Sequence, residues 1–577
     1  MRTWRWVSVL AVLMLVLAAC QGQGASESAA ASEEPEASEP AASESEGPAF
    51  EGASYPEDGP AECGAAETDT NAEYTGNIEQ IRAEDELTVV FDLCNPDVAF
   101  LSKVAFTSFA INDADYLTAN AEDGTIVEAP NGTGPYMLDT WSRGSEITLA
   151  ANPDYWGEAP LSPTVIFRWS AEAAQRLVEL QSGTVDGIDN PGPDDFETIA
   201  ADPNLQLLER EGLNTFYVGF NNAFAPWDDE EVRQAIAMGL DRQAIVDAYY
   251  PPGSEVASHF TPCAIPFACT GDEWYEYDQD AARAVLEPLG ITTTIQYRDV
   301  VRGYLPLPAQ VAVEIQAQLA DIGVTATPEP IESTAFLDAA NAGELDGIHL
   351  LGWGADYPDA TNFLDFHFGS GASVQFGDKF DDITGPLATG ASSVEDADRE
   401  AAYTEANDAI RTHVPMIPIA HGGSGTAWQL DNEGAHSSPL GNESMAVIGP
   451  GADDQLVWMQ NAEPGGLYCA DETDGESLRV CEQVMEALYA YEVGGTAAIP
   501  SLAEECAPNE ALDEWTCTLR EGVTFHDGAS LDANDVVLSY AVQWDAEHPL
   551  HVGRTGTFDY FSALWGGFLN APLPEPS

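Results

Sequence analysis

The chain has 577 residues and a formal charge of −79, from 98 acidic and 19 basic side chains, and 44% of its residues are hydrophobic. A surface this acidic repels nucleic acid and anionic lipid headgroups, so we expect neither as a partner. The acidity can attract a cationic ligand or can reflect a salty or acidic habitat. Because the acidic residues are spread along the whole chain, the sequence favours adaptation to such a habitat over attraction of a cationic ligand.

The first residues have the pattern of an export signal. Arginines precede an apolar stretch from Val7 to Ala19, which is too short to span a membrane, and Cys20 follows it. We interpret residues 1–19 as a signal peptide and Cys20 as a lipidated N-terminus, since this ending resembles a bacterial lipoprotein signal. The alternative is an ordinary secretory signal with an incidental cysteine.

Residues 20–62 consist almost wholly of Ser, Ala, Glu, Gly and Pro. Such a segment cannot bury enough apolar surface to become ordered, so we expect a disordered acidic linker that tethers the rest. No later window reaches the roughly 18 consecutive apolar residues of a spanning helix, which predicts membrane attachment through the lipid anchor only. The remaining roughly 500 residues are enough for two or three globular lobes.

Eight of the nine cysteines lie beyond Cys20, and an even number in an exported chain indicates disulfides. The short-range pairs to expect first are Cys263 with Cys269, Cys469 with Cys481, and Cys506 with Cys517. Other connectivities stay open. We expect no metal site, because the cysteines lack the close Cys-x-x-Cys spacing of a zinc cluster and no His-rich tract is present.

The central region alternates strand-like and helical patterns. Strands are expected over residues 216–220, 292–297 and 347–351. Helices are expected from an acidic first turn at residues 228–231, from Asp241, and from Pro308 to Gly323. The apolar positions that share one face are Val232, Ala235, Ile236, Gly239 and Leu240 in the first of these helices, and Val311, Ile315, Leu319 and Ile322 in the last. This alternation predicts mixed α/β lobes.

The sequence lacks the usual signatures of catalysis. It has no phosphate-binding loop, no zinc-protease helix and no nucleophile elbow. His526 and Asp527 are adjacent, so on a strand they would point to opposite sides, and Gly528 beside them indicates a turn. We therefore expect neither an enzyme nor a bound cofactor.

A series of motifs resembles the family 5 bacterial extracellular solute-binding proteins, which serve oligopeptide, dipeptide and nickel ABC importers. Residues 132–136 read GTGPY, Trp141 follows, and residues 152–157 read NPDYWG. The order then continues with LQSGTVD at 180–186, FN at 220–221, VRQAI at 232–236, DR at 241–242, YDQDA at 277–281 and WGADYPD at 353–359. Each motif alone is weak, but the series in this order is specific.

One part of the family pattern is displaced. Residues 519–528 read LREGVTFHDG and residues 532–537 read DANDVV, which is similar to a family signature that normally precedes GTGPY. Residues 457–464 likewise resemble the family's first strand. We interpret the chain as circularly permuted, which is physically reasonable because domain termini tend to lie close together at the surface. The rival interpretation is a family fold that ends near residue 450 with a separate fragment behind it.

The resemblance implies an α/β, two-lobe Venus-flytrap architecture, the type II periplasmic-binding-protein fold in its large three-subdomain form, circularly permuted. Residues 77–159 with 486–570 would form a small subdomain of lobe I, and residues 160–227 with 431–485 its core. Residues 228–430 would form lobe II. The ligand would lie between the lobes.

The resemblance also selects ligand-binding residues. Asp356 of WGADYPD matches the aspartate that pairs with a peptide's α-ammonium group in peptide-binding members, although it can instead cap the turn into Pro358. Trp353 and Tyr357 can form walls of the pocket or pack in the core. Arg298 and Arg302 can receive a ligand carboxylate or pair with acidic residues. Tyr468, behind the displaced first strand, is a further candidate wall.

The sequence thus predicts a lipid-anchored, extracytoplasmic solute-binding protein, on the periplasmic or outer face of the membrane, that passes peptides to an ABC permease and ATPase complex. The alternatives within binding proteins are a sugar, an opine-like compound or a chelated metal such as nickel. Outside transport, the alternative is a surface sensor that presents its ligand to a receptor.

Overall fold

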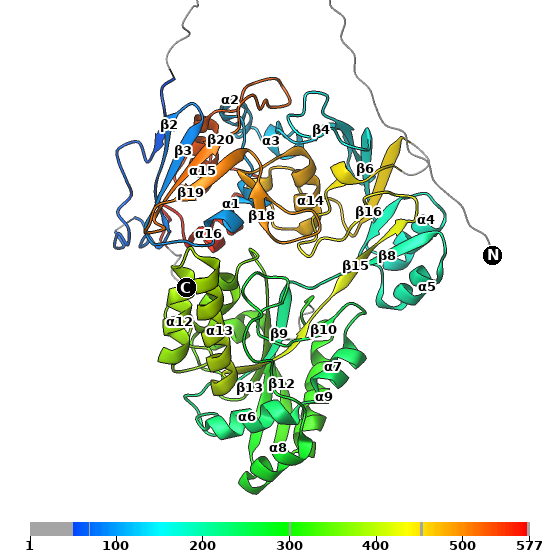
Figure 1. Ribbon diagram of the computed structural model, residues 1–577, viewed down its shortest axis with the longest axis vertical. Coiled ribbons are helices and arrows are strands. Elements are labelled where there is room, and N and C mark those ends of the chain that lie inside the picture. Colours follow the sequence, from blue (N-terminus) through cyan, green and yellow to red (C-terminus); the bar gives the residue numbers. More distant parts are fainter. Residues whose placement is uncertain (1–49, 69, 299–301, 451–453, 574–577) are drawn as a thin grey trace, which may run out of the picture. The chain divides into compact units, whose positions relative to one another are not determined.

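The computed structural model describes residues 50–573, except 69, 299–301 and 451–453. Within this part of the chain the strands form sheets of five, six and seven strands and one two-stranded hairpin. Each large sheet has its own set of helices (Figure 1). The predicted signal peptide and Cys20 lie outside the described residues.

The seven-stranded sheet forms the core of lobe I. Its strands, in spatial order, are β4 (Tyr136–Ser142), β5 (Glu146–Ala151), β6 (Thr164–Trp169), β16 (Gln455–Gln460), β7 (Gly187–Asp189), β15 (Ser424–Gln429) and β8 (Leu205–Arg210). The late strand β16 lies between two early strands and runs parallel to both. The helices of this region are α4 (Ala173–Gln181), α5 (Phe196–Ala201) and α14 (Gly475–Val484).

The five-stranded sheet forms the small subdomain. Its order is β1 (Ser54–Tyr55), β2 (Ile78–Asp85), β3 (Thr88–Leu93), β20 (Glu514–Leu519) and β19 (Ala503–Pro508). Strands from the two ends of the chain therefore share one sheet through the β3–β20 pair. Its helices are α1 (Phe100–Val104), α2 (Ala114–Asn120), α3 (Thr125–Glu128), α15 (Ala533–Trp544) and α16 (Asp559–Trp565), and its hairpin is β17 (Tyr489–Tyr491) with β18 (Ala498–Pro500).

The six-stranded sheet forms lobe II, drawn in green to yellow-green in Figure 1. Its order is β10 (Glu255–Val256), β14 (Met416–His421), β9 (Asn214–Gly219), β13 (Ile348–Gly354), β11 (Thr292–Tyr297) and β12 (Thr325–Pro330). Its main helices are α6 (Glu230–Gly239), α7 (Arg242–Tyr249), α8 (Gln279–Leu286), α9 (Pro308–Asp321), α10 (Ser333–Asn341), α12 (Asp381–Ala391) and α13 (Asp396–His413).

The helices and strands expected in lobe II are confirmed. Helix α6 begins after Asp229, whose side chain caps it, and α7 begins after Asp241 in the same way. Both predicted apolar faces are buried in the lobe II core. The expected strands correspond to β9, β11 and β13, so local periodicity was sufficient to find these elements.

The lobe boundaries differ from those we expected. Strands β4 and β5 belong to the seven-stranded sheet and not to the small subdomain, β9 belongs to lobe II, and β15 belongs to lobe I. Lobe II therefore comprises residues 214–421 and not 228–430. The physical reason is that strands enter and leave lobe II as one antiparallel pair, β9 with β14, which no local pattern reveals.

The linker predicted over residues 20–62 ends earlier than expected, since Ser54 and Tyr55 pair with β2. Among the cysteines, the Cys263–Cys269 and Cys506–Cys517 disulfides are present, and Cys63 pairs with Cys94. The predicted Cys469–Cys481 disulfide is absent, and both residues are free and buried. They lie on separate elements, a short helical turn and α14, within one hydrophobic cluster.

The displaced motif lies against the GTGPY motif. The backbone N–H of His526 donates to the carbonyl of Gly132 at 2.8 Å, and its Nε2 lies 3.1 Å from the carbonyl oxygen of Gly134. Thr133, Tyr155 and Trp156 donate to the carboxylate of Glu486, each at 2.8 Å. These motifs therefore join segments far apart in sequence, and His526 has a structural role.

Candidate ligand-binding site

The two lobes are joined by a pair of strand crossings. Residues 211–213 connect β8 to β9, and residues 422–423 connect β14 to β15. The side chain of Asn214 holds both crossings together, because its Nδ2 donates to the carbonyl of Gly422 and its Oδ1 accepts from the Gly422 N–H, each at 2.8 Å. A Cβ atom on Gly212 would lie 1.9 Å from the oxygen of Gly422, so the close approach requires glycine.

A cavity of about 880 Å³ lies against this hinge, which is enough space for a small peptide. Lobe I contributes Asn190, Arg210, Ser424, Pro439, Leu440 and Gly441 to its lining. Lobe II contributes Tyr217, Arg298, Arg302, Tyr304, Leu337, Asn341, Leu351, Trp353, Asp356, Phe366, His367, Ser373 and Gln375. The lining combines aromatic and aliphatic side chains with many polar and charged ones, which suits a small ligand that carries charges and hydrogen-bonding groups.

Asp356 lies at the end of this cavity where it meets a second one of about 140 Å³, and both cavities have Ala355, Asp356, Leu440 and Gly441 in their linings. Asn362 holds the aspartate from both sides, accepting from its N–H at 2.9 Å and donating to its Oδ2 at 3.0 Å. Burial raises the pKa of the Asp356 carboxyl, and the Asn362 hydrogen bond opposes the rise. Among the ion pairs of the described residues, none includes Asp356.

Aromatic rings form one wall of the cavity. Trp353 stacks on Phe366 with ring centroids 4.2 Å apart, and its indole N–H donates to Asn362 at 3.2 Å. His367 lines the wall edge-on to Trp353, and burial lowers its pKa to about 4, so the ring is neutral. The wall is therefore flat and uncharged, which suits apolar and aromatic groups.

Two predicted arginines also line the cavity. Arg298 donates from Nη2 to the hydroxyl of Tyr304 at 2.9 Å, and Arg302 forms a β-bridge with Leu305. Both follow β11 and lie on the lobe II side, as does Asp356. One face of the cavity thus presents an acid and two bases, which can receive the two opposite charges of a zwitterion.

The other two predicted residues lie elsewhere. Tyr357 lines a separate cavity of about 340 Å³ beside the small subdomain. Tyr468 is only 2% exposed and packs edge-on against Phe558 in the hydrophobic core of the small subdomain. Neither contributes to the lining of the main cavity.

The lobe I side of the site contains a buried ring of ion pairs that sequence reasoning missed. Arg210 contacts Asp189 at 2.9 Å and Glu443 at 2.5 Å, and Arg479 contacts Asp189 at 3.1 Å and Glu443 at 3.0 Å. Burial alone would raise the pKa of both carboxyls, but the arginines lower the pKa of each below its ordinary value. We call these four residues the ion-pair ring; its charges cancel.

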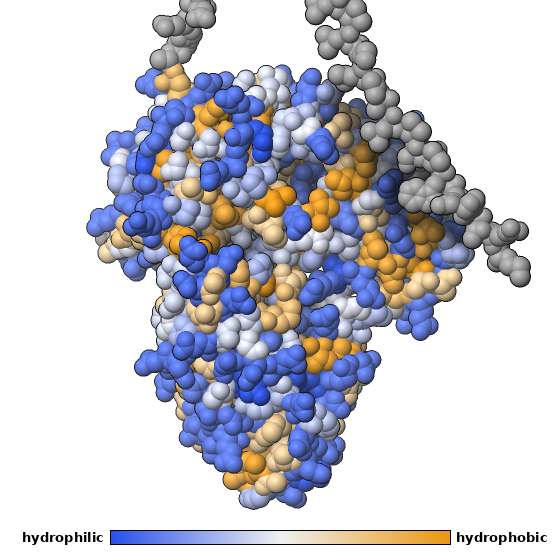
Figure 2. Space-filling model, in the orientation of Figure 1, coloured by the Kyte–Doolittle hydropathy of each residue, from blue (hydrophilic) through white to orange (hydrophobic). Residues whose placement is uncertain are grey.

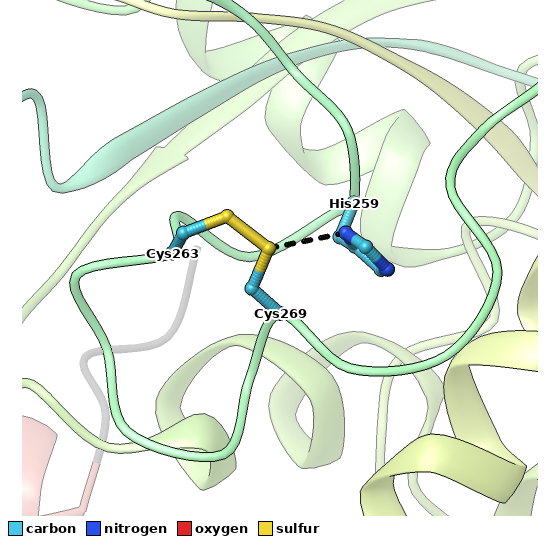
Figure 3. Close-up of side chains that lie close together, drawn as sticks. All are labelled: His259, Cys263 and Cys269. Atoms are coloured by element: carbon cyan, nitrogen blue, oxygen red, sulfur yellow. Dashed lines mark hydrogen bonds between the residues drawn. A yellow bond between two sulfur atoms is a disulfide. The ribbon is translucent and has the colours of Figure 1, made fainter.

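Figure 3 shows a cluster in lobe II where His259 lies beside Cys263 and Cys269. Their potential ligand atoms lie within 4.8 Å of one another, and His259 Nδ1 is 3.2 Å from the sulfur of Cys269. Both sulfurs belong to one disulfide, so neither is a thiolate that could bind a metal. In this oxidation state the cluster offers only the imidazole.

Hydrophilic residues cover most of the face seen in Figure 2, with hydrophobic residues in separate patches. Among the described helices, none combines the length and the apolar character that crossing a bilayer requires.

Comparison with known proteins assigns these features to one family. The family model described as "Bacterial extracellular solute-binding proteins, family 5 Middle" matches residues 46–375 and 497–557. Di/tripeptide-binding protein 1 of Pseudomonas aeruginosa is 31% identical over 392 residues, 65% of this chain and 72% of that protein. Heme-binding protein A of Haemophilus influenzae is 30% identical over 380 residues, 64% and 69% of the two chains. The solved structure of HbpA2 from Haemophilus parasuis, 30% identical, superposes with a TM-score of 0.60 over 63% of this chain and 74% of that one.

Proposed function

Since this chain belongs to the family 5 bacterial extracellular solute-binding proteins and has their type II fold, we propose that it captures short peptides between its lobes and delivers them to an ABC importer. The observation that carries the proposal is Asp356, a half-buried carboxylate that lines the cavity and has a hydrogen-bonding amide instead of a cation beside it. A peptide's α-ammonium group would supply the missing positive charge. The role is binding and transport, without catalysis.

The geometry supports a ligand with charges at both ends. Asp356 would bind the ammonium group, and Arg298 or Arg302 would bind the carboxylate. Side chains of the peptide would lie against Trp353 and Phe366, where a flat apolar surface accepts many shapes. Several similar proteins have names that specify dipeptides or di- and tripeptides, which agrees with a ligand of this size.

We further propose that the fold is circularly permuted and that Cys20 carries a lipid anchor on the outer side of the cytoplasmic membrane or facing a periplasm. Two observations support the permutation: β16 lies between β6 and β7, and β20 pairs with β3. A segment after β1 also meets the C-terminal segment, because the Ala72 N–H donates to the carbonyl of Ala571 at 2.9 Å. Joined ends and a new cut elsewhere would leave such a core intact.

Thermal unfolding of residues 50–577 with and without ligand tests the proposal, because a ligand that binds only the folded state raises the melting temperature. The panel contains peptides, free amino acids, oligosaccharides, nickel chelates and haem, the last because one similar protein is named for it. We expect a rise with short peptides that disappears in Asp356→Ala. A rise only with sugars, chelates or haem would refute peptide capture.

A further inference from the structure

Lys103 connects the small subdomain to lobe II at a point outside the ligand cavity. It lies on α1, and its Nζ contacts Asp97 Oδ2 at 2.7 Å. The same ammonium group lies 5.2 Å from the ring centroid of Tyr357 and 5.3 Å from that of Trp565. Asp97 and Trp565 belong to the small subdomain, whereas Tyr357 follows β13 of lobe II. The lysine therefore lies between an aromatic ring of the small subdomain and an aromatic ring of lobe II.

The surroundings of Lys103 favour a strong contact. The residue is only 8% exposed, and a cation over an aromatic ring is more favourable when water is excluded. Tyr357 packs on the hydrophobic cluster of the small subdomain, and its hydroxyl lies 3.1 Å from Thr361 Oγ1. When the lobes separate, Lys103 keeps Asp97, but the face of Tyr357 must be exposed to water. A separation of the lobes would therefore break the contact of Lys103 with Tyr357.

Tyr357 is also the residue next to Asp356. Asp356 lines the ligand cavity, and Tyr357 lines the cavity beside Lys103. A single segment therefore carries both the group that faces the ligand and the group that holds the lobes together. The contact of Tyr357 with Lys103 therefore also holds Asp356 near Leu440 and Gly441, the lobe I residues that line the same cavity as Asp356.

We propose that Lys103 is a positioning residue: with Tyr357 it forms a latch that stabilises the closed state and so raises ligand affinity without touching the ligand. The effect on affinity rests on the proposed function, but the effect on closure does not. If only the closed state binds tightly, the dissociation constant varies inversely with the closed fraction of the ligand-free protein. Loss of the latch should lower that fraction and weaken binding by the same factor.

A neutral contact between the small subdomain and lobe II offers a comparison. The hydroxyl of Thr496, in the hairpin between β17 and β18, donates to the carbonyl of Ala264 in lobe II at 2.7 Å. Ala264 lies within the loop that the Cys263–Cys269 disulfide closes. A single neutral hydrogen bond contributes little net free energy, so Thr496→Val should change closure less than loss of the latch.

The experiment measures closure and affinity in the same variants: Lys103→Met, Lys103→Arg and Tyr357→Leu. Labels on non-natural amino acids at the exposed positions Glu84 and Asp280 report the distance between the small subdomain and lobe II. Affinity is measured by calorimetry with the peptide that gives the largest thermal shift. Arg168→Met, which removes a cation that pairs with Glu146 inside lobe I, is the matched control.

We expect Lys103→Met and Tyr357→Leu each to lower the closed fraction and to raise the dissociation constant about tenfold. Lys103→Arg should stay within about twofold of the wild type, because a guanidinium also binds an aromatic face. The double variant Lys103→Met with Tyr357→Leu should be no worse than either single one, since both remove one interaction.

Three outcomes are distinguishable. If Tyr357→Leu, which keeps the Lys103–Asp97 pair, leaves both closure and affinity unchanged, the latch is refuted. If affinity falls while the closed fraction does not, Lys103 acts in some other way and the latch is again refuted. If no peptide binds the wild type, the proposed function fails, and a lower closed fraction in ligand-free Lys103→Met and Tyr357→Leu still supports the latch. Where Lys103→Met unfolds, Lys103→Met with Asp97→Asn removes the unpaired acid.

Discussion

Acids lie on both sides of the cleft, and only those of lobe I are neutralised by other side chains of the protein. On the lobe I side, Asp189 and Glu443 each contact both Arg210 and Arg479. On the lobe II side, Asp356 has the amide of Asn362 as its partner. The protein thus neutralises the acids on the lobe I side with its own arginines, whereas on the lobe II side a cationic ligand would neutralise Asp356.

The difference separates stability from recognition. A buried carboxylate with two arginines has its charge compensated, so removal of one arginine is costly for folding. A partly buried carboxylate with only an amide is destabilised by desolvation, which raises the pKa of Asp356, and it gains most from an arriving cation. We expect substitutions in the ion-pair ring to affect folding and substitutions near Asp356 to affect binding.

The largest effect should come from Arg479→Met. This change leaves Asp189 and Glu443 with one arginine between them, and an uncompensated buried charge typically lowers the free energy of unfolding by roughly 3–5 kcal/mol. Chemical denaturation measures it. The control is Arg168→Met, where both partners are about one-third exposed and the expected loss is about 1 kcal/mol or less. Similar losses of unfolding free energy in Arg479→Met and Arg168→Met would contradict the expected difference between the buried and the exposed ion pairs.

The second prediction isolates the charge of the ligand. N-acetylation of a peptide should weaken its binding to the wild type by roughly 10- to 100-fold, because the charge-assisted hydrogen bond to Asp356 is lost. In Asp356→Asn the free and acetylated peptides should bind within about twofold of each other. Calorimetry with both peptides measures this, and an equal effect of acetylation in the two proteins would exclude Asp356 as the amine partner.

A third prediction concerns Asp365, a lobe II acid near the ion pair of Asp359 with Arg399. Burial, with the nearby Asp359 charge, raises the pKa of Asp365 to about 8, and among the described residues its Oδ2 has no hydrogen-bond partner. The folded protein then holds a proton that the unfolded chain releases near pH 4, so the stabilising contribution is lost as the pH rises from about 4 to about 8. Relative to Asp365→Asn, the wild type should lose at least about 1 kcal/mol over this range. If the free energies of unfolding of the two proteins change with pH in the same way, the raised pKa of Asp365 is contradicted.

The smallest effect should come from Asn362→Ala. Asn362 donates to Asp356 and accepts from the indole of Trp353, so its loss should weaken peptide binding about fivefold, close to 1 kcal/mol. The pKa of Asp356 should also rise, because the lost hydrogen bond lowers it. Since binding requires the carboxylate, the pH at which binding is half lost on acidification should move upward. An unchanged pH profile with weaker binding would mean that Asn362 acts only on Trp353.

Local patterns predicted the local structure well. Capping aspartates and apolar faces located α6 and α7, and the same reasoning located α9 from Pro308. Lobe boundaries were wrong because they depend on which strands pair on each side of the hinge. Strand β9 pairs with β14 in lobe II and β15 pairs with β8 in lobe I, and each of these partners lies about 200 residues away in sequence. The Cys469–Cys481 prediction failed for a related reason, since short spacing in sequence does not fix the relative orientation of two elements.

The lining of the candidate cavity was predicted in part. Asp356, Trp353, Arg298 and Arg302 line the cavity, but the neighbouring Tyr357 points to a different one. The ion-pair ring was missed because its members come from four separate segments: β7, β8, the loop between β15 and β16, and α14. The available signal was the scarcity of basic residues, 19 against 98 acidic ones, which makes each arginine a candidate for a specific ion pair.

The place of β16 has a consequence for the order in which the chain folds. Lobe II is continuous from residue 214 to residue 421 and contains all the strands of its sheet, so it can form as soon as that segment leaves the ribosome. The seven-stranded sheet cannot, because β6 and β7 have a gap between them until residues 455–460 have been synthesised. The exposed edges of these two strands are then the part of the nascent chain most in need of protection from aggregation.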